Sequence, residues 1–162
     1  MDFLPLSNII FSKIIPCIQS HEGLSIFAGE RAKFEGWFKV ELCSILSETV
    51  DDVIPEKDLI DITFEDWAIE LKTTNTNYRF PEVKNKTRPI TDNVNGILED
   101  IRNLQDTNYS NKGVLFVVFP ALHIDKNWQT HLEKISKNLQ DIKFKEFKFK
   151  NNVPGILYFG LI

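Results

Sequence analysis

Three charged residues lie inside two short apolar runs, where burial makes an unpaired charge costly. The runs LIDITF and WAIELK alternate apolar and polar side chains and are separated by two residues, which predicts the two strands of a tight hairpin. In the register that a two-residue turn imposes, Asp61 lies directly opposite Glu70. Lys72 follows Glu70 by two residues and therefore shares its face of the sheet.

Two opposed carboxylates repel each other, so this register favours a bound cation. Their Cβ atoms would lie roughly 5 Å apart, a distance that a divalent metal ion bridges with oxygen ligands. The alternative is a solvated polar face on which Lys72 simply neutralises Glu70, and a one-residue slip of the register would separate the two acids. The pattern therefore predicts either an acidic metal site or an ordinary exposed strand face.

The helix expected before the hairpin offers a third acid. Residues 29–49 place apolar side chains at three- and four-residue steps, which predicts an amphipathic helix. On the helical wheel Glu35 lies at the margin of the apolar stripe and Glu41 lies within it, so either one is a candidate to face the hairpin. Glu35 has the alternative of a salt bridge to Arg31 or Lys39.

The pattern of the whole chain predicts an α/β fold with a mixed central β-sheet flanked by helices. The N-terminal segment is expected to be a helix docked on the core, and a polar break is expected around Pro55. The continuously apolar run GVLFVVFPAL predicts a central strand that is covered on both faces. Residues 1–162 are interpreted as a single domain.

The remaining elements are expected to cover and extend this sheet. Asp92 is the expected N-cap of a helix that follows the loop after the hairpin. A third amphipathic helix precedes two final strands, expected at residues 142–149 and 156–161 with Pro154 and Gly155 between them. The order of helix, strands, helix, strand, helix and strands indicates a mixed sheet.

The composition is that of a globular protein without a strong bias toward nucleic acid. The net charge is -4 at pH 7, whereas many nucleic-acid-binding domains are basic. Cys17 and Cys43 show no CxxC spacing, which is typical of a protein kept in a reducing compartment. Asp2 and later polar residues interrupt the apolar N-terminus, so neither a signal peptide nor a membrane span is expected. We therefore expect a cytoplasmic protein that does not bind a membrane.

Basic residues concentrate in the predicted loop at residues 73–91, which leaves the sheet directly after Lys72. Lysine and arginine contacts to phosphate release counterions and drive nucleic-acid binding. The position of the loop beside the predicted site therefore makes its basic residues candidates for substrate contact. The alternative is a solvated loop whose charges only offset the acidic hairpin. The candidates are Arg79, Lys84, Lys86 and Arg88.

The arrangement of these acids and the lysine resembles the PD-(D/E)XK nuclease superfamily, which has the restriction-endonuclease-like fold. In that family an acid on one strand and an acid-x-Lys motif on the next follow a helix that carries a Glu. Asp61 matches the first acid, and Glu70-Leu71-Lys72 matches the second half of the motif. The likeness covers roughly residues 29–122. The sequence departs from the family in having Ile60 where a Pro is usual.

The resemblance implies a metal-dependent nuclease that hydrolyses phosphodiester bonds, with DNA as the expected substrate. Magnesium, with manganese as a substitute, would be held by Asp61, Glu70, the carbonyl of Leu71 and a helix acid, either Glu35 or Glu41. The ion would polarise the phosphate and activate a water molecule. Asp61, Glu70 and Glu35 are therefore predicted to be part of the catalytic group.

Lys72 completes that group, because its ammonium would orient the water and stabilise the charge of the transition state. The competing hypothesis is a non-catalytic domain of the same fold that binds nucleic acid or a protein partner in a defence or repair complex. A complete set of acids with Lys72 favours the enzyme. The oligomeric state is left open, with a homodimer as one alternative.

Overall fold

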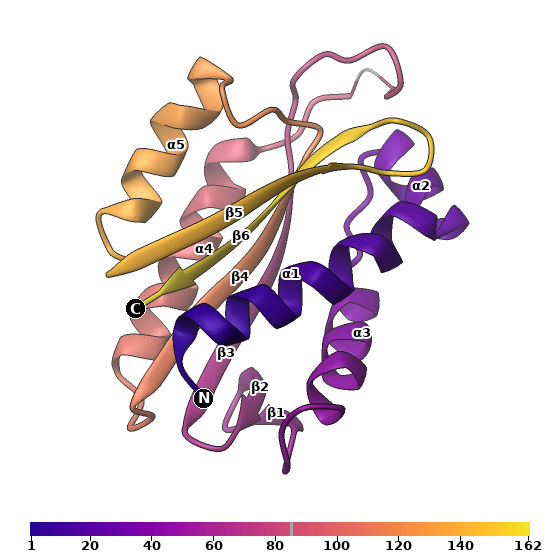
Figure 1. Cartoon of the computed structure of the whole chain (residues 1–162). Coiled ribbons are helices and arrows are strands. Elements are labelled where there is room, and N and C mark those ends of the chain that lie inside the picture. The colour runs from indigo at the N-terminus through magenta and orange to yellow at the C-terminus, as the bar shows by residue number, and fades with distance from the viewer. Residues whose placement is uncertain (85) are drawn as a thin grey trace.

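The computed structural model describes residues 1–84 and 86–162, which form six strands and five helices around one mixed sheet (Figure 1). The helices are α1 (Phe3–Ser20), α2 (Glu22–Gly29), α3 (Glu35–Ser47), α4 (Ile90–Gln105) and α5 (Lys126–Ser136). The strands are β1 (Ile54–Lys57), β2 (Ile60–Phe64), β3 (Trp67–Asn75), β4 (Asn111–Phe119), β5 (Asp141–Lys148) and β6 (Pro154–Leu161). Their order in the sheet is β1-β2-β3-β4-β6-β5, with β3 parallel to β4 and the other neighbours antiparallel. The predicted mixed α/β architecture is confirmed.

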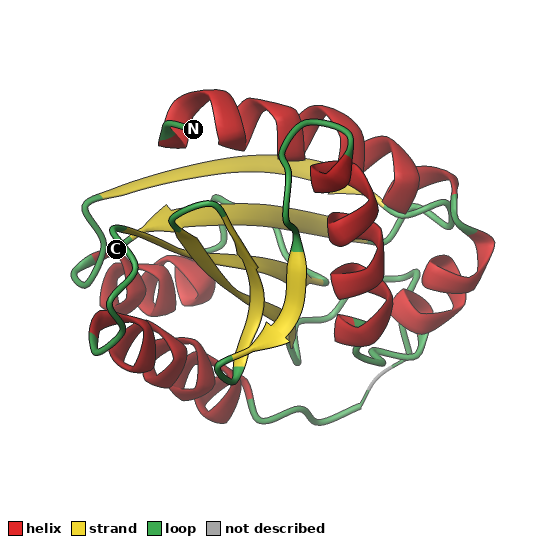
Figure 2. Cartoon of the chain, turned by 90° about the horizontal axis from the view of Figure 1, so that it is seen from below, coloured by secondary structure: helices red, strands yellow, loops and turns green. Residues whose placement is uncertain are grey.

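Helices cover both faces of the curved sheet, as the view from below shows (Figure 2). Alternation along β4 sends its side chains into two separate cores. Leu115, Val117 and Phe119 pack with α1 and α3, whereas Val114, Phe116 and Val118 pack with α4 and α5. The prediction of a central strand covered on both faces is therefore confirmed.

α1 has the length and hydropathy of a membrane span, but its inner residues belong to the core of this structure. Leu6, Ile10, Ile14 and Ile18 are completely buried against the sheet and α3. This packing is the docking on the core that was expected of the N-terminal segment.

The hairpin has the predicted register next to its turn, but the predicted pair of Asp61 with Glu70 is not among the paired residues of β2 and β3. Phe64 pairs with Trp67 and Ile62 pairs with Ile69, across a turn made by Glu65 and Asp66. Ile62, Phe64, Trp67 and Ile69 all join the core on the α1 and α3 side, because they share one face of the pleated sheet.

Several predicted boundaries are wrong for local reasons. The helix predicted over residues 29–49 is shorter and begins at Glu35, because Arg31 adopts a positive φ of 57° and residues 30–34 turn the chain after the end of α2 at Gly29. α4 begins at Ile90, so Asp92 lies in its first turn and is not the N-cap. β6 begins at Pro154, so the turn after β5 ends earlier than predicted.

The polar break around Pro55 contains an unexpected edge strand, β1. All four residues of β1 are exposed, so it has no apolar alternation to identify it. Proline is tolerated on an edge strand because its missing N–H faces away from the sheet.

Candidate functional site

The candidate site lies where β2 and β3 stop pairing in the regular way. Regular pairing of the two strands extends from Phe64 and Trp67 to Ile62 and Ile69. Beyond Ile69, the backbone N–H of Leu71 donates a hydrogen bond of 2.8 Å to Oδ2 of the Asp61 side chain. The Asp61 carboxylate thus occupies a place between the strands that a backbone carbonyl would otherwise fill. We call this opening, formed by Asp61, Glu70 and Leu71, the strand fork.

Glu70 and Asp61 interact inside the strand fork, and their pKa values shift in opposite directions. Both carboxyl groups are half-buried. Burial, the hydrogen bond with Asp61 and the negative charges of Asp61 and Asp100 raise the pKa of Glu70 to about 8. Burial also opposes ionisation of Asp61, but hydrogen bonds from Glu70, Lys39 and the Leu71 N–H outweigh it and lower the pKa of Asp61. The proton therefore resides on Glu70 at neutral pH.

Lys39 of α3 supplies positive charge at one side of the strand fork. Its Nζ lies 2.6 Å from Asp61 Oδ1 and 3.0 Å from Glu56 Oε1 of β1. The sequence indicates Lys39 only as a partner of Glu35 on the same helix. No helical or strand spacing relates Lys39 to Asp61, because a turn and β1 separate α3 from β2.

Lys72 lies on the α4 side of β3, where it meets an acid that the sequence analysis did not select. Its Nζ is 2.8 Å from Asp100 Oδ2, and both side chains are mostly buried. Burial lowers the pKa of Lys72, but the bond to Asp100 outweighs it and raises the value. Burial raises the pKa of Asp100. The feature of the sequence that could have identified Asp100 is its position at the margin of the apolar stripe of α4, beside Ile97 and Ile101.

The structure brings Glu35, and not Glu41, close to Lys72 and Asp100. Glu35 Oε1 accepts a hydrogen bond of 2.9 Å from the backbone N–H of Thr73, the residue after Lys72. Its charge acts on both Lys72 and Asp100. Glu41 instead lies beside Cys17 of α1, where burial and then the bond to Glu41 raise the pKa of the thiol. Of the two helix acids, Glu35 is the one placed to act with Lys72.

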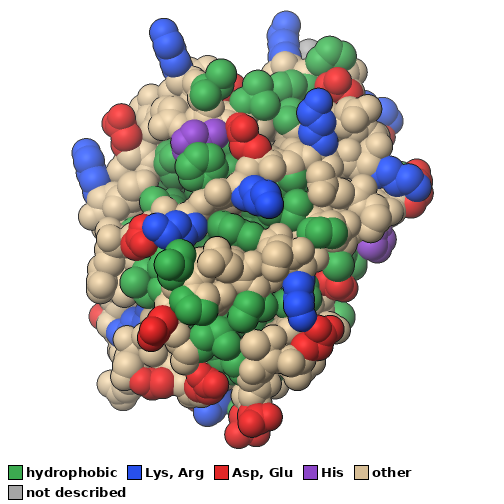
Figure 3. All heavy atoms as spheres, viewed as in Figure 1, with side chains coloured by type: hydrophobic (Ala, Val, Ile, Leu, Met, Phe, Trp, Pro, Cys, Tyr) green, Lys and Arg blue, Asp and Glu red, His purple; other side chains and the backbone are tan. Residues whose placement is uncertain are grey.

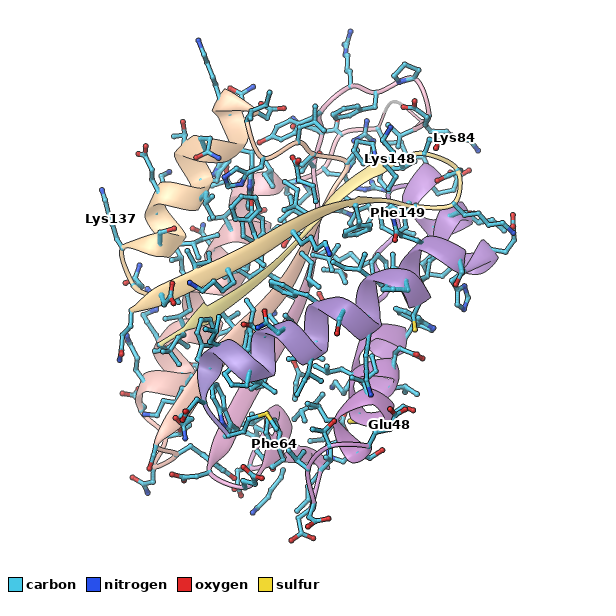
Figure 4. All side chains as sticks on the ribbon, in the orientation of Figure 1. Glu48, Phe64, Lys84, Lys137, Lys148 and Phe149 are labelled. Atoms are coloured by element: carbon cyan, nitrogen blue, oxygen red, sulfur yellow. The ribbon has the colours of Figure 1, made fainter. Side chains whose placement is uncertain are left out.

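The predicted loop begins after Asn75, at the opposite end of β3 from the hairpin turn, and Lys84 and Phe64 mark these two ends in Figure 4. A completely buried arginine, Arg31, holds the loop by its backbone. Its guanidinium donates to the carbonyls of Thr76, Tyr78 and Lys84 at 2.7–2.8 Å. These carbonyls satisfy a cation that has no carboxylate partner among the hydrogen bonds and ion pairs of the described residues.

Two of the four basic candidates in the loop are already paired within the protein. Lys84 and Lys86 both form ion pairs with Glu30, the latter at 2.9 Å. Arg88 donates to the Arg31 carbonyl at 3.4 Å. Arg79 is exposed. The loop therefore presents less uncompensated positive charge than its sequence suggests.

The donor atoms in the strand fork are hard oxygens, which suit magnesium. Within residues 1–84 and 86–162, no three His, Cys, Asp or Glu side chains form a group that could hold a metal ion by themselves. Two carboxylates, Asp61 and Glu70, are available together with the Leu71 carbonyl, which points to the same side of β3 as the Leu71 N–H. Magnesium commonly takes one or two carboxylates and keeps several waters, so this set fits the ion.

Comparison with protein families, with curated proteins and with solved structures gave no match to the chain.

Proposed function

We propose that the protein is a metal-dependent nuclease that hydrolyses phosphodiester bonds, with DNA as its substrate. The observation that carries this proposal is the strand fork, where two carboxyl groups are forced together and Lys72 follows two residues later. A carboxyl pair that retains a proton near neutral pH is short of positive charge. A divalent cation would supply that charge.

The order of elements supports the resemblance to the PD-(D/E)XK nucleases. α3 carries Glu35, β2 carries Asp61 and β3 carries Glu70 and Lys72, followed by α4 and the parallel strand β4. This is the order of helix acid, strand acid and acid-x-Lys on which the resemblance rests. It extends over the same part of the chain, from α3 to β4.

Asp61, Glu70 and the carbonyl of Leu71 would hold a magnesium ion, and the chemistry that such an ion would supply is polarisation of the phosphate and activation of a water. Asp61 is already oriented by the Leu71 N–H and by Lys39, so little side-chain freedom remains to be lost. Glu35, anchored on the Thr73 N–H, would accept a hydrogen bond from a water of the ion. These residues orient the ion and the water.

Lys72 would place its ammonium near the phosphate and stabilise the negative charge that develops there. Asp100 holds Lys72 in its protonated form and fixes its position at 2.8 Å. An ammonium in a half-buried, preorganised site stabilises a transition state more than the same group in water. Lys72 therefore acts on charge and orientation, and not as a nucleophile.

The decisive experiment compares wild-type protein with Lys72→Ala on single- and double-stranded DNA and RNA in magnesium and in manganese. We expect metal-dependent cleavage by the wild type and a loss of about 10²–10³ in rate for the variant. Metal affinity measured by calorimetry should be nearly unchanged, because Lys72 is not a ligand. Lys13→Ala, which removes an exposed lysine that pairs with Glu48, is the matched control.

The competing hypothesis, a non-catalytic domain that binds nucleic acid or a protein partner, is favoured by one observation. Asp61 and Lys72 are each neutralised by a residue of the protein, Lys39 and Asp100. If folded wild-type protein cleaves none of the substrates in manganese, this second function replaces the first.

A further inference from the structure

The free edge of the sheet at β5 is separated from the strand fork by β4 and β6 and has no part in the proposed nuclease. β5 is the last strand in the order β1-β2-β3-β4-β6-β5, so within the sheet it pairs only with β6. Figure 1 shows β5 along the front of the sheet with α1 beside it, and Figure 2 shows the same two elements adjacent from below. An unpaired strand edge is a template for a further strand.

The hydrogen bonds of the β5–β6 hairpin identify the backbone groups that point away from the sheet. The N–H of Phe149 donates to the carbonyl of Val153 at 2.9 Å, in the same register as the rest of the hairpin. Because bonded and non-bonded pairs alternate along antiparallel strands, the odd-numbered residues of β5 bond to β6. The N–H and carbonyl groups of Phe144 and Glu146 therefore point out of the free edge. Within the described residues, these four groups have no hydrogen-bond partner.

A groove of about 290 Å³ runs beside this edge, between α1 and the first half of β5. The residues that line it are Ser7, Asn8, Phe11, Ile142, Lys143 and Phe144. Since successive side chains of a strand point to opposite faces, a space lined by three consecutive residues of β5 lies along the edge of the sheet. A strand added in this groove would have the backbone of β5 on one side and α1 on the other.

Phe144 gives the edge an exposed apolar side chain whose position is fixed. It is 45% exposed, and the ring of His123 stacks on it with 3.7 Å between the centroids. His123 is held in turn, because its Nδ1 lies 2.8 Å from the hydroxyl of the completely buried Tyr158. Aromatic side chains pair favourably with apolar residues on a neighbouring strand. The exposed ring of Phe144 therefore favours an apolar side chain on an added strand.

Lysines give the same edge an excess of positive charge. Lys143 pairs with Asp141 at 3.0 Å, but Lys145 and Lys148 have no partner among the ion pairs of the described residues. Glu146 does not neutralise them, because its Oε1 accepts a hydrogen bond of 2.7 Å from a backbone N–H of the turn before α5. Opposite charges on facing strands are stabilising. The edge therefore favours acidic side chains on an added strand.

A second copy of β5 matches this edge poorly. A closed dimer formed by antiparallel addition has a two-fold axis through the centre of the paired strands. Of the two registers with the fullest overlap, one is centred on Lys145 and places this lysine opposite its own copy. The other is centred on Phe144 and places Lys143 opposite Lys145. Like charges in facing positions are destabilising, so the lysines protect the edge from self-association.

We propose that the edge of β5 binds an extended acidic segment of a partner protein, which adds a seventh strand to the sheet in the groove beside α1. In this segment acidic side chains alternate with apolar ones, because Lys143 and Lys145 lie on one face of the sheet and Phe144 lies on the other. Backbone hydrogen bonds to Phe144 and Glu146 supply affinity, and the alternation supplies selectivity. The proposal is independent of the nuclease function, since it uses neither the strand fork nor the loop.

The test measures the binding of a fluorescent synthetic peptide of alternating glutamate and valine, by anisotropy in EDTA. Two peptides of the same length serve for comparison: the same sequence with every internal backbone nitrogen methylated, and a peptide of alternating lysine and valine. We expect the glutamate–valine peptide to bind and the lysine–valine peptide not to bind. Methylation should weaken binding at least about tenfold, because each lost hydrogen bond is worth about fivefold.

Two further measurements locate the bound peptide. Lys145→Glu should weaken binding about fivefold, the scale of exposed ion pairs. Lys57→Glu is the matched control, since it makes the same change at an exposed lysine of β1, the opposite edge of the sheet, and should bind like the wild type. In amide hydrogen exchange followed by NMR, the peptide should slow the N–H groups of Phe144 and Glu146. The N–H of Lys145, which already bonds to β6, should be unaffected.

Three results would overturn the proposal: no binding of the glutamate–valine peptide by folded wild-type protein, equal binding of the methylated peptide, or an equal loss in Lys57→Glu. A dimer detected by sedimentation without peptide, with the N–H groups of Phe144 and Glu146 already protected, would assign the edge to a second copy and also overturn it. The nuclease function fails by a different result, the absence of metal-dependent cleavage.

Discussion

Two glutamates of this protein have opposite electrostatic environments, although both are partly exposed to solvent. Glu70 in the strand fork faces Asp61 and Asp100, and its pKa is raised to about 8. Glu30 beside the loop receives hydrogen bonds from Lys84 and Lys86, and its pKa is lowered to about 2. Glu70 therefore has no partner among the ion pairs of the described residues, whereas Glu30 neutralises two of the lysines of the loop.

The same division is visible on the molecular surface. In Figure 3, acidic side chains gather toward the lower end and most of the lysines and arginines toward the upper end. The acidic residues of the strand fork and the basic residues of the loop therefore do not neutralise one another. Lys84 and Lys86 of the loop are neutralised by ion pairs with Glu30. In the strand fork, the negative charge is reduced because Glu70 retains a proton. A bound cation would therefore stabilise the carboxyl groups of the strand fork and not the loop.

The largest expected effect is on metal affinity at the strand fork. Asp61→Asn and Glu70→Gln should each weaken magnesium and manganese binding by at least about tenfold, because each removes a carboxylate from the site. Isothermal titration calorimetry measures this. Glu41→Gln, on the same helix as Glu35 but beside Cys17, should bind metal like the wild type. An equal loss in Glu41→Gln would show that the site is elsewhere.

Reversing the loop charges should have the next largest effect. Lys84, Lys86 and Arg88 changed together to Glu should weaken nucleic-acid binding by about tenfold and reduce its dependence on salt. Glu30→Gln should act in the opposite direction, because it releases Lys84 and Lys86 for phosphate contact. Anisotropy titrations over a range of salt concentrations report both. If neither variant changes the salt dependence, the loop does not contact the substrate.

Lys39 allows the electrostatics of the strand fork to be changed without touching a predicted ligand. Lys39→Met removes the ammonium that pairs with Asp61 and Glu56, which leaves the acids more negative. We expect magnesium to bind several-fold more tightly at low salt, with a smaller gain at high salt. Lys13→Met, which breaks an exposed pair with Glu48, should leave the affinity unchanged. Weaker metal binding in Lys39→Met would instead assign Lys39 to orienting Asp61.

The smallest effect concerns stability in EDTA. The pKa of Glu70 is raised from 4.5 to about 8, so the folded protein binds the proton more tightly than the unfolded chain. This contribution to stability is complete below about pH 4.5 and is lost as the pH rises through 8. Thermal unfolding should therefore show wild type losing more stability over this range than Glu70→Gln. Parallel pH profiles would contradict the proton assignment.

Much of the fold could be predicted because the responsible signals are local. The alternation of LIDITF and WAIELK and the two residues between them determined the hairpin register, since side chains on a strand alternate strictly between faces. The continuous apolar run of β4 predicted a strand with both of its faces covered by helices. β1 could not be predicted, because all four of its residues are exposed and it owes its conformation to pairing with β2.

For the candidate site, too, some features follow from the sequence and others only from the tertiary structure. The sequence by itself determined that Asp61, Glu70 and Lys72 share one region, because all three belong to a single hairpin with a defined register. Only the tertiary structure decided which groups surround them: Glu35 rather than Glu41, Lys39 on Asp61, and Asp100 on Lys72. These partners come from α3 and α4, whose rotation about their axes depends on how their apolar faces pack against the sheet. The protonation of Glu70 depends on burial and on charges brought in from separate elements, which no local pattern specifies.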